Sequence, residues 1–354
     1  MTPKRLALTA VLIAALLAGC SGTAEKISPQ VAVRDAARST ASAREATYTL
    51  SVAGSEADMN ALFNDGAPLS AEDREGLALL RNGHIALATA AGRFGLDVKA
   101  GDLEHAVELR VIDKKLYARA DVAGLAKLFK ASPEEINQTV AALAGRDGFG
   151  FLAAAVQGRW LVADFSQLGG IFEQMAGQLG VKTPAGTADP NAAKAEASAR
   201  LKPLKDAIGK ALSDDAAIAK LKSDAVGDHY RATVSSLRDF YAKVRPAFAA
   251  QLGSLPMANG LPAVEAVPDK PASMDVWIKS GRVVRLEVPL AQLSPNPKTD
   301  AGPVALRLDI YRSAPSLAAP ADAVNVDVMG LLGSFFKELT GGLGQIPALK
   351  GITG

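Results

Sequence analysis

The sequence predicts an α+β fold: a strongly curved antiparallel β-sheet with one apolar face and with α-helices that cover this face. Two observations predict this class. Strand-like segments gather near both ends of the chain, and helical segments occupy its middle. The strand-like segments alternate apolar and polar residues, which is typical of a sheet with one face toward water. We therefore expect the two groups of strands to join into one sheet within a single domain, residues 31–328.

The composition is that of a globular protein and excludes several function classes. The 354 residues carry 39 Lys and Arg against 37 Asp and Glu, a formal charge of +2. Two of the basic residues, Lys4 and Arg5, lie in a segment that we expect to be removed. The remaining neutral chain has no basic stripe, which argues against nucleic-acid binding. A single cysteine excludes an intramolecular disulfide and a Cys-based zinc cluster, and three histidines leave little for a metal site.

The N-terminus predicts an export signal followed by a lipid anchor. Lys4 and Arg5 precede an apolar stretch too short to span a bilayer, so residues 1–19 are read as a signal peptide. The run Leu17-Ala18-Gly19-Cys20 resembles the lipobox of bacterial lipoproteins, which implies a diacylglyceryl thioether and acyl chains such as palmitate on Cys20. The alternative is an ordinary signal peptide with an incidental cysteine. Residues 20–30 would form a polar tether outside the cell membrane, held there by the anchor.

The first strands belong to a meander. After a helix expected over residues 31–46, the alternating run Tyr48-Thr49-Leu50-Ser51-Val52 predicts a strand. Apolar and charged residues alternate again in Val107-Glu108-Leu109-Arg110-Val111. Short turns separate the strands of this region, which is the spacing of an antiparallel meander. These strands are expected over residues 84–90, 94–99, 104–112 and 116–120.

The middle of the chain predicts helices, and the end predicts a second meander. Ser132-Pro133-Glu134-Glu135 fits a capping box with proline at the first helical position. Further helices are expected over residues 167–179, 191–222 and 237–252, the second of which contains Pro203 and is read as two helices or one kinked helix. Strands are then expected over residues 273–279, 281–290, 304–311 and 324–328. The Gly-rich apolar tail, residues 329–354, has three candidate roles: docking over a cavity mouth, touching the membrane, or packing on the core.

The search for catalytic chemistry predicts that the protein is not an enzyme and holds no cofactor or metal. His84, His105 and His229 lie far apart in the sequence, without the spacing of metal ligands. No G-x-S-x-G elbow is present, and no S-x-x-K precedes a K-T-G. The run Gly145-Arg146-Asp147-Gly148-Phe149-Gly150 lacks the order of a phosphate-binding loop and is read as a turn. Paired acids such as Glu134-Glu135 lie at expected helix N-termini, where they compensate the helix dipole.

Because alanine side chains are small, the sequence is compatible with two interpretations of the protein interior. A curved sheet filled by alanine-rich helices encloses either an ordinary packed core or a dry cavity suited to a hydrocarbon ligand. A register slip of one residue would exchange the two faces of each strand. With the expected register, the candidate lining residues are Leu87, Leu96, Val98, Leu109, Val111, Val276, Ile278, Val284, Leu286, Leu306 and Leu308.

Several stretches together resemble a known family. Besides the lipobox, they are Lys115-Leu116-Tyr117-Ala118-Arg119, Gly158-Arg159-Trp160-Leu161, Met274-Asp275-Val276-Trp277-Ile278, Gly281-Arg282-Val283-Val284-Arg285-Leu286 and Leu306-Arg307-Leu308-Asp309-Ile310-Tyr311, followed by Ala319-Pro320. In these stretches the chain resembles the LolA-like lipoproteins of the LppX/LprG type, the lipid-carrying lipoproteins of actinobacterial envelopes. The resemblance implies a half-barrel, a strongly bent antiparallel sheet with helices over its concave face and an acyl-chain cavity between them. It also implies an extracytoplasmic, lipid-anchored protein that binds a lipid or lipoglycan and carries or presents it without covalent chemistry.

Two other functions compete with the lipid carrier. One is a non-catalytic envelope lipoprotein with a filled core that acts as a scaffold or partner of another envelope protein. The other is an envelope hydrolase, which would need His, Ser or acidic side chains to converge in space. For the carrier, the partners are the membrane, a lipid or lipoglycan ligand and, as a further candidate, an envelope lipid transporter.

Overall fold

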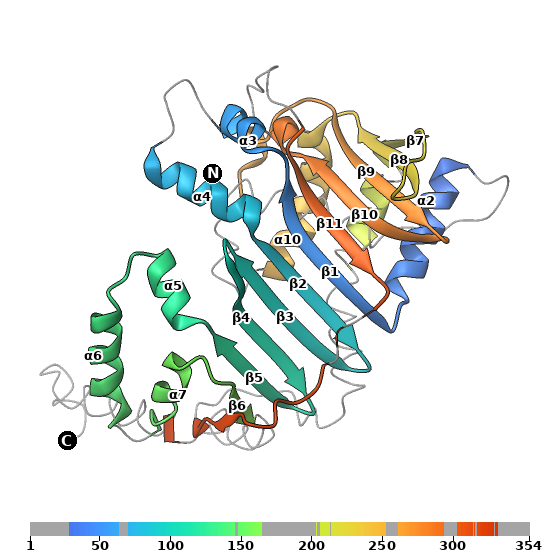
Figure 1. Ribbon diagram of the computed structural model, residues 1–354. Helices are drawn as coiled ribbons and strands as arrows, with labels where there is room; N and C mark the ends of the chain where they lie inside the picture. Colours follow the sequence, from blue (N-terminus) through green and yellow to red (C-terminus); the bar gives the residue numbers. More distant parts are fainter. Residues whose placement is uncertain are drawn as a thin grey trace, which may run out of the picture. The chain divides into compact units, whose positions relative to one another are not determined.

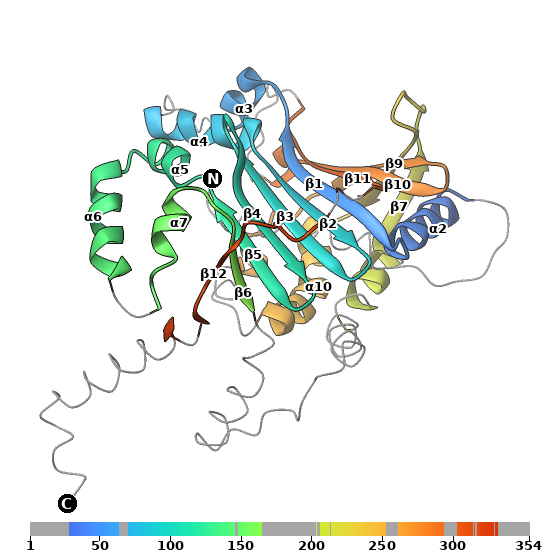
Figure 2. The same cartoon turned by 60° about the horizontal axis from the view of Figure 1, so that its bottom comes forward.

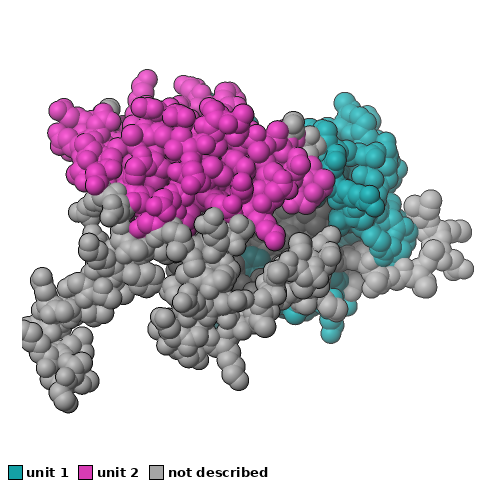
Figure 3. Space-filling view, turned by 90° about the horizontal axis from the view of Figure 1, so that it is seen from below, with its two compact units in different colours: residues 1–86, 187–314 teal, residues 87–186, 315–354 magenta. Residues whose placement is uncertain are grey.

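The chain forms two compact units, which Figure 3 colours separately. Unit 1 comprises Met1–Ala86 and Thr187–Ala314, and unit 2 comprises Leu87–Gly186 and Pro315–Gly354. The structure is a computed structural model that describes residues 28–63, 70–145, 148–164, 203, 206–212, 214–252, 261–293, 303–313, 315, 317–328 and 330–331. Cys20, the expected signal peptide, the expected helix at 167–179 and nearly all of the tail lie outside the described residues.

Unit 1 is built on an antiparallel sheet in the strand order β1-β11-β10-β9-β8-β7. The sheet turns sharply between β1 and β9, as Figures 1 and 2 show. Its first strand pairs with nearly the last one, so that Thr47 lies opposite Tyr311. The strands are β1 (Glu45–Ala53), β7 (Ala216–Lys220), β8 (Asp228–Val234), β9 (Ala272–Lys279), β10 (Arg282–Pro289) and β11 (Ala305–Tyr311).

Helices pack on the apolar face of this sheet. The amphipathic helix α2 (Pro29–Ala41) lies against β9 and β10, and Thr40 accepts a hydrogen bond from the Val283 amide at 2.9 Å, where a register shift interrupts the β9–β10 pairing. Helix α10 (Leu237–Leu252) contributes fully buried side chains, among them Phe240. The unit also contains α3 (Glu56–Phe63), α4 (Ala71–Asn82) and the short 3₁₀ helices η3 (Val264–Ala266) and η4 (Leu290–Leu293).

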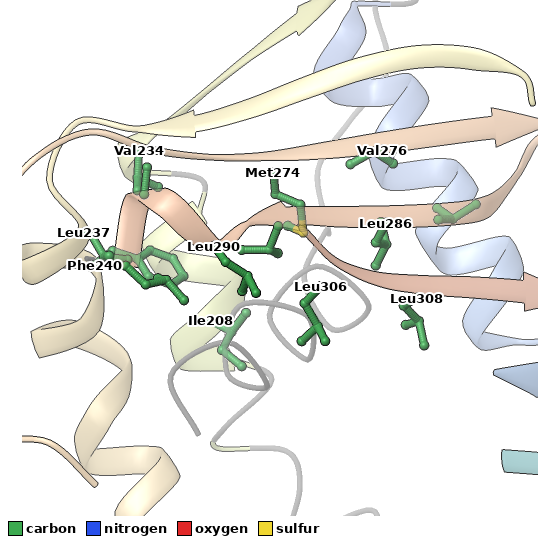
Figure 4. Packing of buried hydrophobic residues seen from close by; sticks show 14 of the residues in the cluster. Ile208, Val234, Leu237, Phe240, Met274, Val276, Leu286, Leu290, Leu306 and Leu308 are labelled. Carbon is green, nitrogen blue, oxygen red and sulfur yellow. The ribbon is translucent and has the colours of Figure 1, made fainter. Parts of the chain in front are cut away.

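The core of unit 1 is tightly closed. Leu286 is 1% exposed, Leu306 5% and Leu308 7%, and these side chains leave neighbouring strands on the same side, in one cluster with Phe240 and Ile208 (Figure 4). Alternation explains the pattern, because every second residue of β11 enters this core and the residues between them do not. Hydrophobic burial here stabilises the unit by about 25 cal/mol per Å² of apolar surface removed from water.

Unit 2 contains strands in the order β12-β6-β5-β4-β3. The pairs β3–β4, β4–β5 and β5–β6 are antiparallel, whereas β12 runs parallel to β6. Strand β2 (His84–Ala90) carries the chain from one unit into the other. The other strands are β3 (Arg93–Ala100), β4 (Leu103–Ile112), β5 (Lys115–Ala120), β6 (Leu161–Asp164) and β12 (Val324–Asn325).

Three described helices of unit 2 follow β5: α5 (Val122–Leu128), α6 (Pro133–Ala144) and α7 (Leu152–Val156). Asp121 caps α5, because its Oδ1 accepts a hydrogen bond from the Gly124 amide at 2.8 Å. The Ser132 half of the expected capping box of α6 is present: Ser132 Oγ accepts from the Glu135 amide at 3.4 Å. Helices α6 and α7 pack on each other.

The predicted α+β class and the antiparallel sheet are confirmed, and the extents of three elements are corrected. The helix expected over residues 31–46 ends at Ala41, and the strand expected over residues 324–328 is only Val324–Asn325. The prediction of helix throughout 191–222 is wrong at its end, where Ala216–Lys220 form strand β7. The alanines and lysine favour a helix locally, but pairing with β8 overrides that preference. Residues 206–212 are helical, as expected. The expectation of one domain over residues 31–328 stays a prediction. The chain passes from unit 1 to unit 2 within β2, between Ala86 and Leu87.

Candidate functional site

The sheet of unit 2 has one face that is apolar at almost every position. Directly opposed residues of paired strands share a face, and the pairs Leu96–Leu109 and Val111–Leu116 lie on this one. We call it the apolar face. Its residues are Leu87, Thr89, Phe94, Leu96, Val98, Val107, Leu109, Val111, Leu116, Ala118, Ala120, Leu161 and Ala163.

None of these apolar-face residues is buried. Leu87 and Phe94 are each 37% exposed and Val111 is 40% exposed, so large side chains remain in contact with water. Scattered exposed hydrophobics are normal, but neighbouring ones on several strands form a patch. Thr89 supplies its one polar side chain, so the patch is suited to hydrocarbon.

The opposite face of the same sheet carries the charged residues, and it is covered. We call it the covered face. Glu108 is 7% exposed, Tyr117 8% and Ile112 3%. Trp160, which directly precedes β6, packs with Tyr117 and Ile112 in a small buried cluster that includes Val162. In unit 2, therefore, the charged face is the buried one.

A segment near the end of the chain covers this face, and we call residues 317–326 the strap. In Figure 2 the red segment that leads to β12 crosses β3 and β4. Leu317 is buried over Gly95, where an added Cβ would lie 2.7 Å from Leu317 Cδ2. Backbone bonds continue the contact, since the Val324 amide donates to the Trp160 carbonyl at 2.7 Å. Glycine at position 95 therefore leaves room for the strap.

Arginine side chains hold the strap by its carbonyl groups. Arg93 Nη1 donates to the Leu317 carbonyl at 3.0 Å, and Arg110 Nη1 donates to the Ala318 carbonyl at 2.9 Å. Each bond pairs a charged donor with a backbone carbonyl acceptor. The strap is thus attached by polar groups of the sheet itself.

The charges on the covered face are compensated. Arg119 Nε donates to Glu108 Oε2, and Arg110 Nη2 lies 3.5 Å from Glu108 Oε1. Both guanidinium groups also lie over the Trp160 ring, 4.6 Å (Arg110) and 5.0 Å (Arg119) from its centroid. Partnering of this kind allows a carboxylate to be buried.

Ten of the eleven predicted lining residues fall into two groups. Leu87, Leu96, Val98, Leu109 and Val111 lie on the apolar face of unit 2. Val276, Ile278, Leu286, Leu306 and Leu308 lie in the closed core of unit 1. Val284 lies at the register shift between Val283 and Arg285 and is half-buried.

In unit 1 the polar face of the sheet carries ion pairs. Arg231 makes bonds of 2.8 and 3.0 Å to Asp275, which raise the pKa of Arg231. Further pairs join Arg285 to Asp309 at 2.6 Å and Arg307 to Glu287 at 2.7 Å. These pairs link neighbouring strands on the side away from the core.

Trp277 also lies on this polar face. Its indole stacks on His229 with ring centroids 4.3 Å apart, and its Nε1 donates to Asp224 Oδ2 at 2.8 Å. That hydrogen bond is the main reason why the pKa of Asp224 is lowered. His229 Nε2 lies 3.1 Å from Asp275 Oδ1.

Sequence reasoning missed one cluster of side chains. Asp97, His105 and Glu108 offer ligand atoms that all lie within 4.8 Å of one another. Asp97 and Glu108 are opposed in the β3–β4 pairing, but a regular hairpin between the expected strands 94–99 and 104–112 would instead bring Asp97 opposite Ala106. The position of His105 depends on a register shift that alternation does not predict.

The comparisons with known proteins give a similarity in structure. No protein-family model and no curated protein matches the chain. Among solved structures, the lipoprotein LppX of Mycobacterium tuberculosis matches with a TM-score of 0.30 and 10% identity, over 84% of this chain and 98% of that chain. That structure is a lipoprotein of the type that the sequence resembles. No helix in the described part of the chain combines the length and apolar character needed to cross a membrane.

Proposed function

We propose that the protein is a lipid-binding lipoprotein that holds acyl chains of a lipid or lipoglycan against the apolar face of unit 2 and carries or presents them in the cell envelope. Cys20, once acylated, would anchor it on the outer side of the cell membrane. No covalent step is part of this function. The proposed ligand is defined by its hydrocarbon part, because the apolar face offers almost no hydrogen-bonding side chains.

The observation that carries this proposal is the partial exposure of a continuous apolar sheet face. Covering an alkyl chain on such a face contributes about 0.8 kcal/mol for each CH₂ group removed from water. A fully covered chain of about 16 carbons would contribute at most about 13 kcal/mol, from which the entropy of association is subtracted.

The first experiment is native mass spectrometry with solvent extraction on the full chain carrying Cys20→Ser, expressed in a related host. The substitution removes covalent acylation, so a retained lipid is a noncovalent ligand. We expect a stoichiometric lipid with at least one long acyl chain. Apo protein that also fails to bind added fluorescent lipids would contradict the proposal.

A matched pair of variants locates the binding surface. Leu109→Glu places a carboxylate in the middle of the apolar face, where bound alkyl chains would desolvate it. Tyr311→Glu is the control, because Tyr311 is 53% exposed on β11 of unit 1. We expect Leu109→Glu to lower fluorescent-lipid affinity at least about tenfold and Tyr311→Glu to leave it unchanged, with both variants folded by circular dichroism.

The scaffold function predicts a different outcome. An apolar face that binds a protein partner would give lipid-free protein, and Leu109→Glu would abolish capture of that partner instead. Equal lipid affinity in both variants and in the parent protein would place the lipid elsewhere on the chain.

A further inference from the structure

We propose that Asp97, His105 and Glu108 form a binding site for a divalent transition-metal ion, for which Zn²⁺ is the probe. Their ligand atoms lie within 4.8 Å of one another, and His105 Nδ1 lies 3.0 and 3.1 Å from the two carboxylate oxygens of Asp97. One imidazole nitrogen with two carboxylates is a donor set that Zn²⁺ accepts. Three protein ligands would leave a position for water.

The backbone directs His105 toward this cluster. Simple alternation from Val107 would place His105 on the apolar face. The β3–β4 register shifts between Val98 and Ala100, and His105 contacts Asp97 on the covered face instead. Bulges that re-aim one side chain are characteristic of functional positions.

The partners of Glu108 suit a metal ligand. Arg119 holds Oε2, while the contact of Oε1 with Arg110 is long, at 3.5 Å. Arg110 keeps its bond to the Ala318 carbonyl and its place over Trp160 when an ion takes Oε1. Hydrogen bonds to the outer oxygen of a ligating carboxylate typically orient it for the ion.

The spacing requires only small rearrangement. Ligands about 2.1 Å from a tetrahedral Zn²⁺ lie about 3.4 Å apart, close to the present separation of His105 and Asp97. The side chain of His105 is 53% exposed and that of Asp97 32%, so both can adjust and an ion can enter from solvent. The side chain of Glu108, 9% exposed, forms the floor of the site, toward which the two more exposed ligands would move.

Calorimetric titration with ZnCl₂ tests the site in the chelator-treated full chain without a polyhistidine tag and with Cys20→Ser, so that no thiol competes. We expect one saturable site, with affinity at least about tenfold lower in His105→Ala and Asp97→Asn. His84→Ala is the matched control and keeps the parent affinity, since His84 lies at the start of β2. A Zn²⁺-dependent rise in melting temperature, present in the parent and His84→Ala and absent in His105→Ala, is the second readout.

The proposal is overturned if the parent shows no saturable binding below millimolar Zn²⁺. It is also overturned if His105→Ala binds as tightly as the parent or if several weak sites appear equally in all variants. Neither result depends on lipid, so the outcome is independent of the proposed function.

Discussion

The sheets of the two units use the same alternation of apolar and polar residues but cover opposite faces. In unit 1, α2 and α10 close the apolar face, and the ion pairs of Asp275, Asp309 and Glu287 lie on the other side. In unit 2 the strap covers the charged face, while Phe94 and Val111 on the apolar face stay in contact with water. Alternation therefore defines two faces, whereas the elements that pack on them decide which face becomes a core.

Truncating a leucine in each sheet gives the largest expected difference. Leu286→Ala in the closed core of unit 1 should lower the free energy of unfolding by about 2–5 kcal/mol, because it leaves a cavity. Leu96→Ala on the apolar face should cost less than about 1.5 kcal/mol without lipid, since water already reaches that side chain. Guanidinium unfolding of the purified variants measures both. Equal losses would mean that the apolar face is packed in solution, and the comparison between the units would fail.

Removing the buried charge of the covered face gives the next effect. Glu108→Gln keeps the shape of the side chain but leaves Arg110 and Arg119 without a carboxylate, and should cost about 1–3 kcal/mol. We expect no larger loss of unfolding free energy, because both arginines are partly exposed and water screens their charges. Glu104→Gln is the control, with its carboxylate 69% exposed, and should leave unfolding nearly unchanged. If the two variants unfold alike, the charged face is open to water.

A substitution of Gly95 tests whether the strap lies on the covered face, because an open face and a covered one predict stability changes of opposite sign. Gly95→Val improves strand propensity and would stabilise an open sheet face. Beneath the strap, however, its Cβ would meet Leu317, so we expect a loss of about 1–3 kcal/mol. Limited proteolysis should then cut the strap of Gly95→Val sooner than that of the parent protein. A more stable Gly95→Val variant whose strap is cut at the same rate as in the parent protein would mean that the strap does not lie on the covered face.

The smallest expected effect is a pH dependence on the polar face of unit 1. Because the folded pKa of Asp224 is lowered, its contribution to stability is present above the unfolded pKa near 4 and is lost as pH falls through the folded value. The chain has two tryptophans, so Trp160→Phe leaves Trp277 as the single indole. We expect its fluorescence to change below pH 4 and to lose that transition in Asp224→Asn. A transition that persists in Asp224→Asn would assign the change to another group.

The strands were predictable because their period and turns are local signals. Residues 84–90 and 237–252 match β2 and α10 at both ends, since glycine, proline and capping residues mark the boundaries. Strand β7 was not predictable, because only its pairing with β8 overrides the helix preference of its alanines. Local pattern specifies elements, while partners distant in sequence decide their final state.

The candidate site was predictable in part for the same reason. Alternation placed Leu96 and Leu109 on one apolar face, but it could not distinguish that face from the one that carries Leu286 and Leu306. That difference comes from the packing of α2, α10 and the strap, which the sequence of a single strand does not determine. The orientation of His105 was unpredictable because a register shift reverses it.

The pairing of β1 with β11 has a consequence for folding. Thr47 and Tyr311 are 264 positions apart in the sequence (311 − 47), so unit 1 completes its sheet only after a very large loop has closed. The hairpins β3–β4 and β4–β5 need only short turns and should form much earlier. During that interval the chain exposes strands that later become core, and a stopped-flow experiment should find a slow final phase that Leu306→Ala, on β11, retards and Leu109→Ala, on β4, does not.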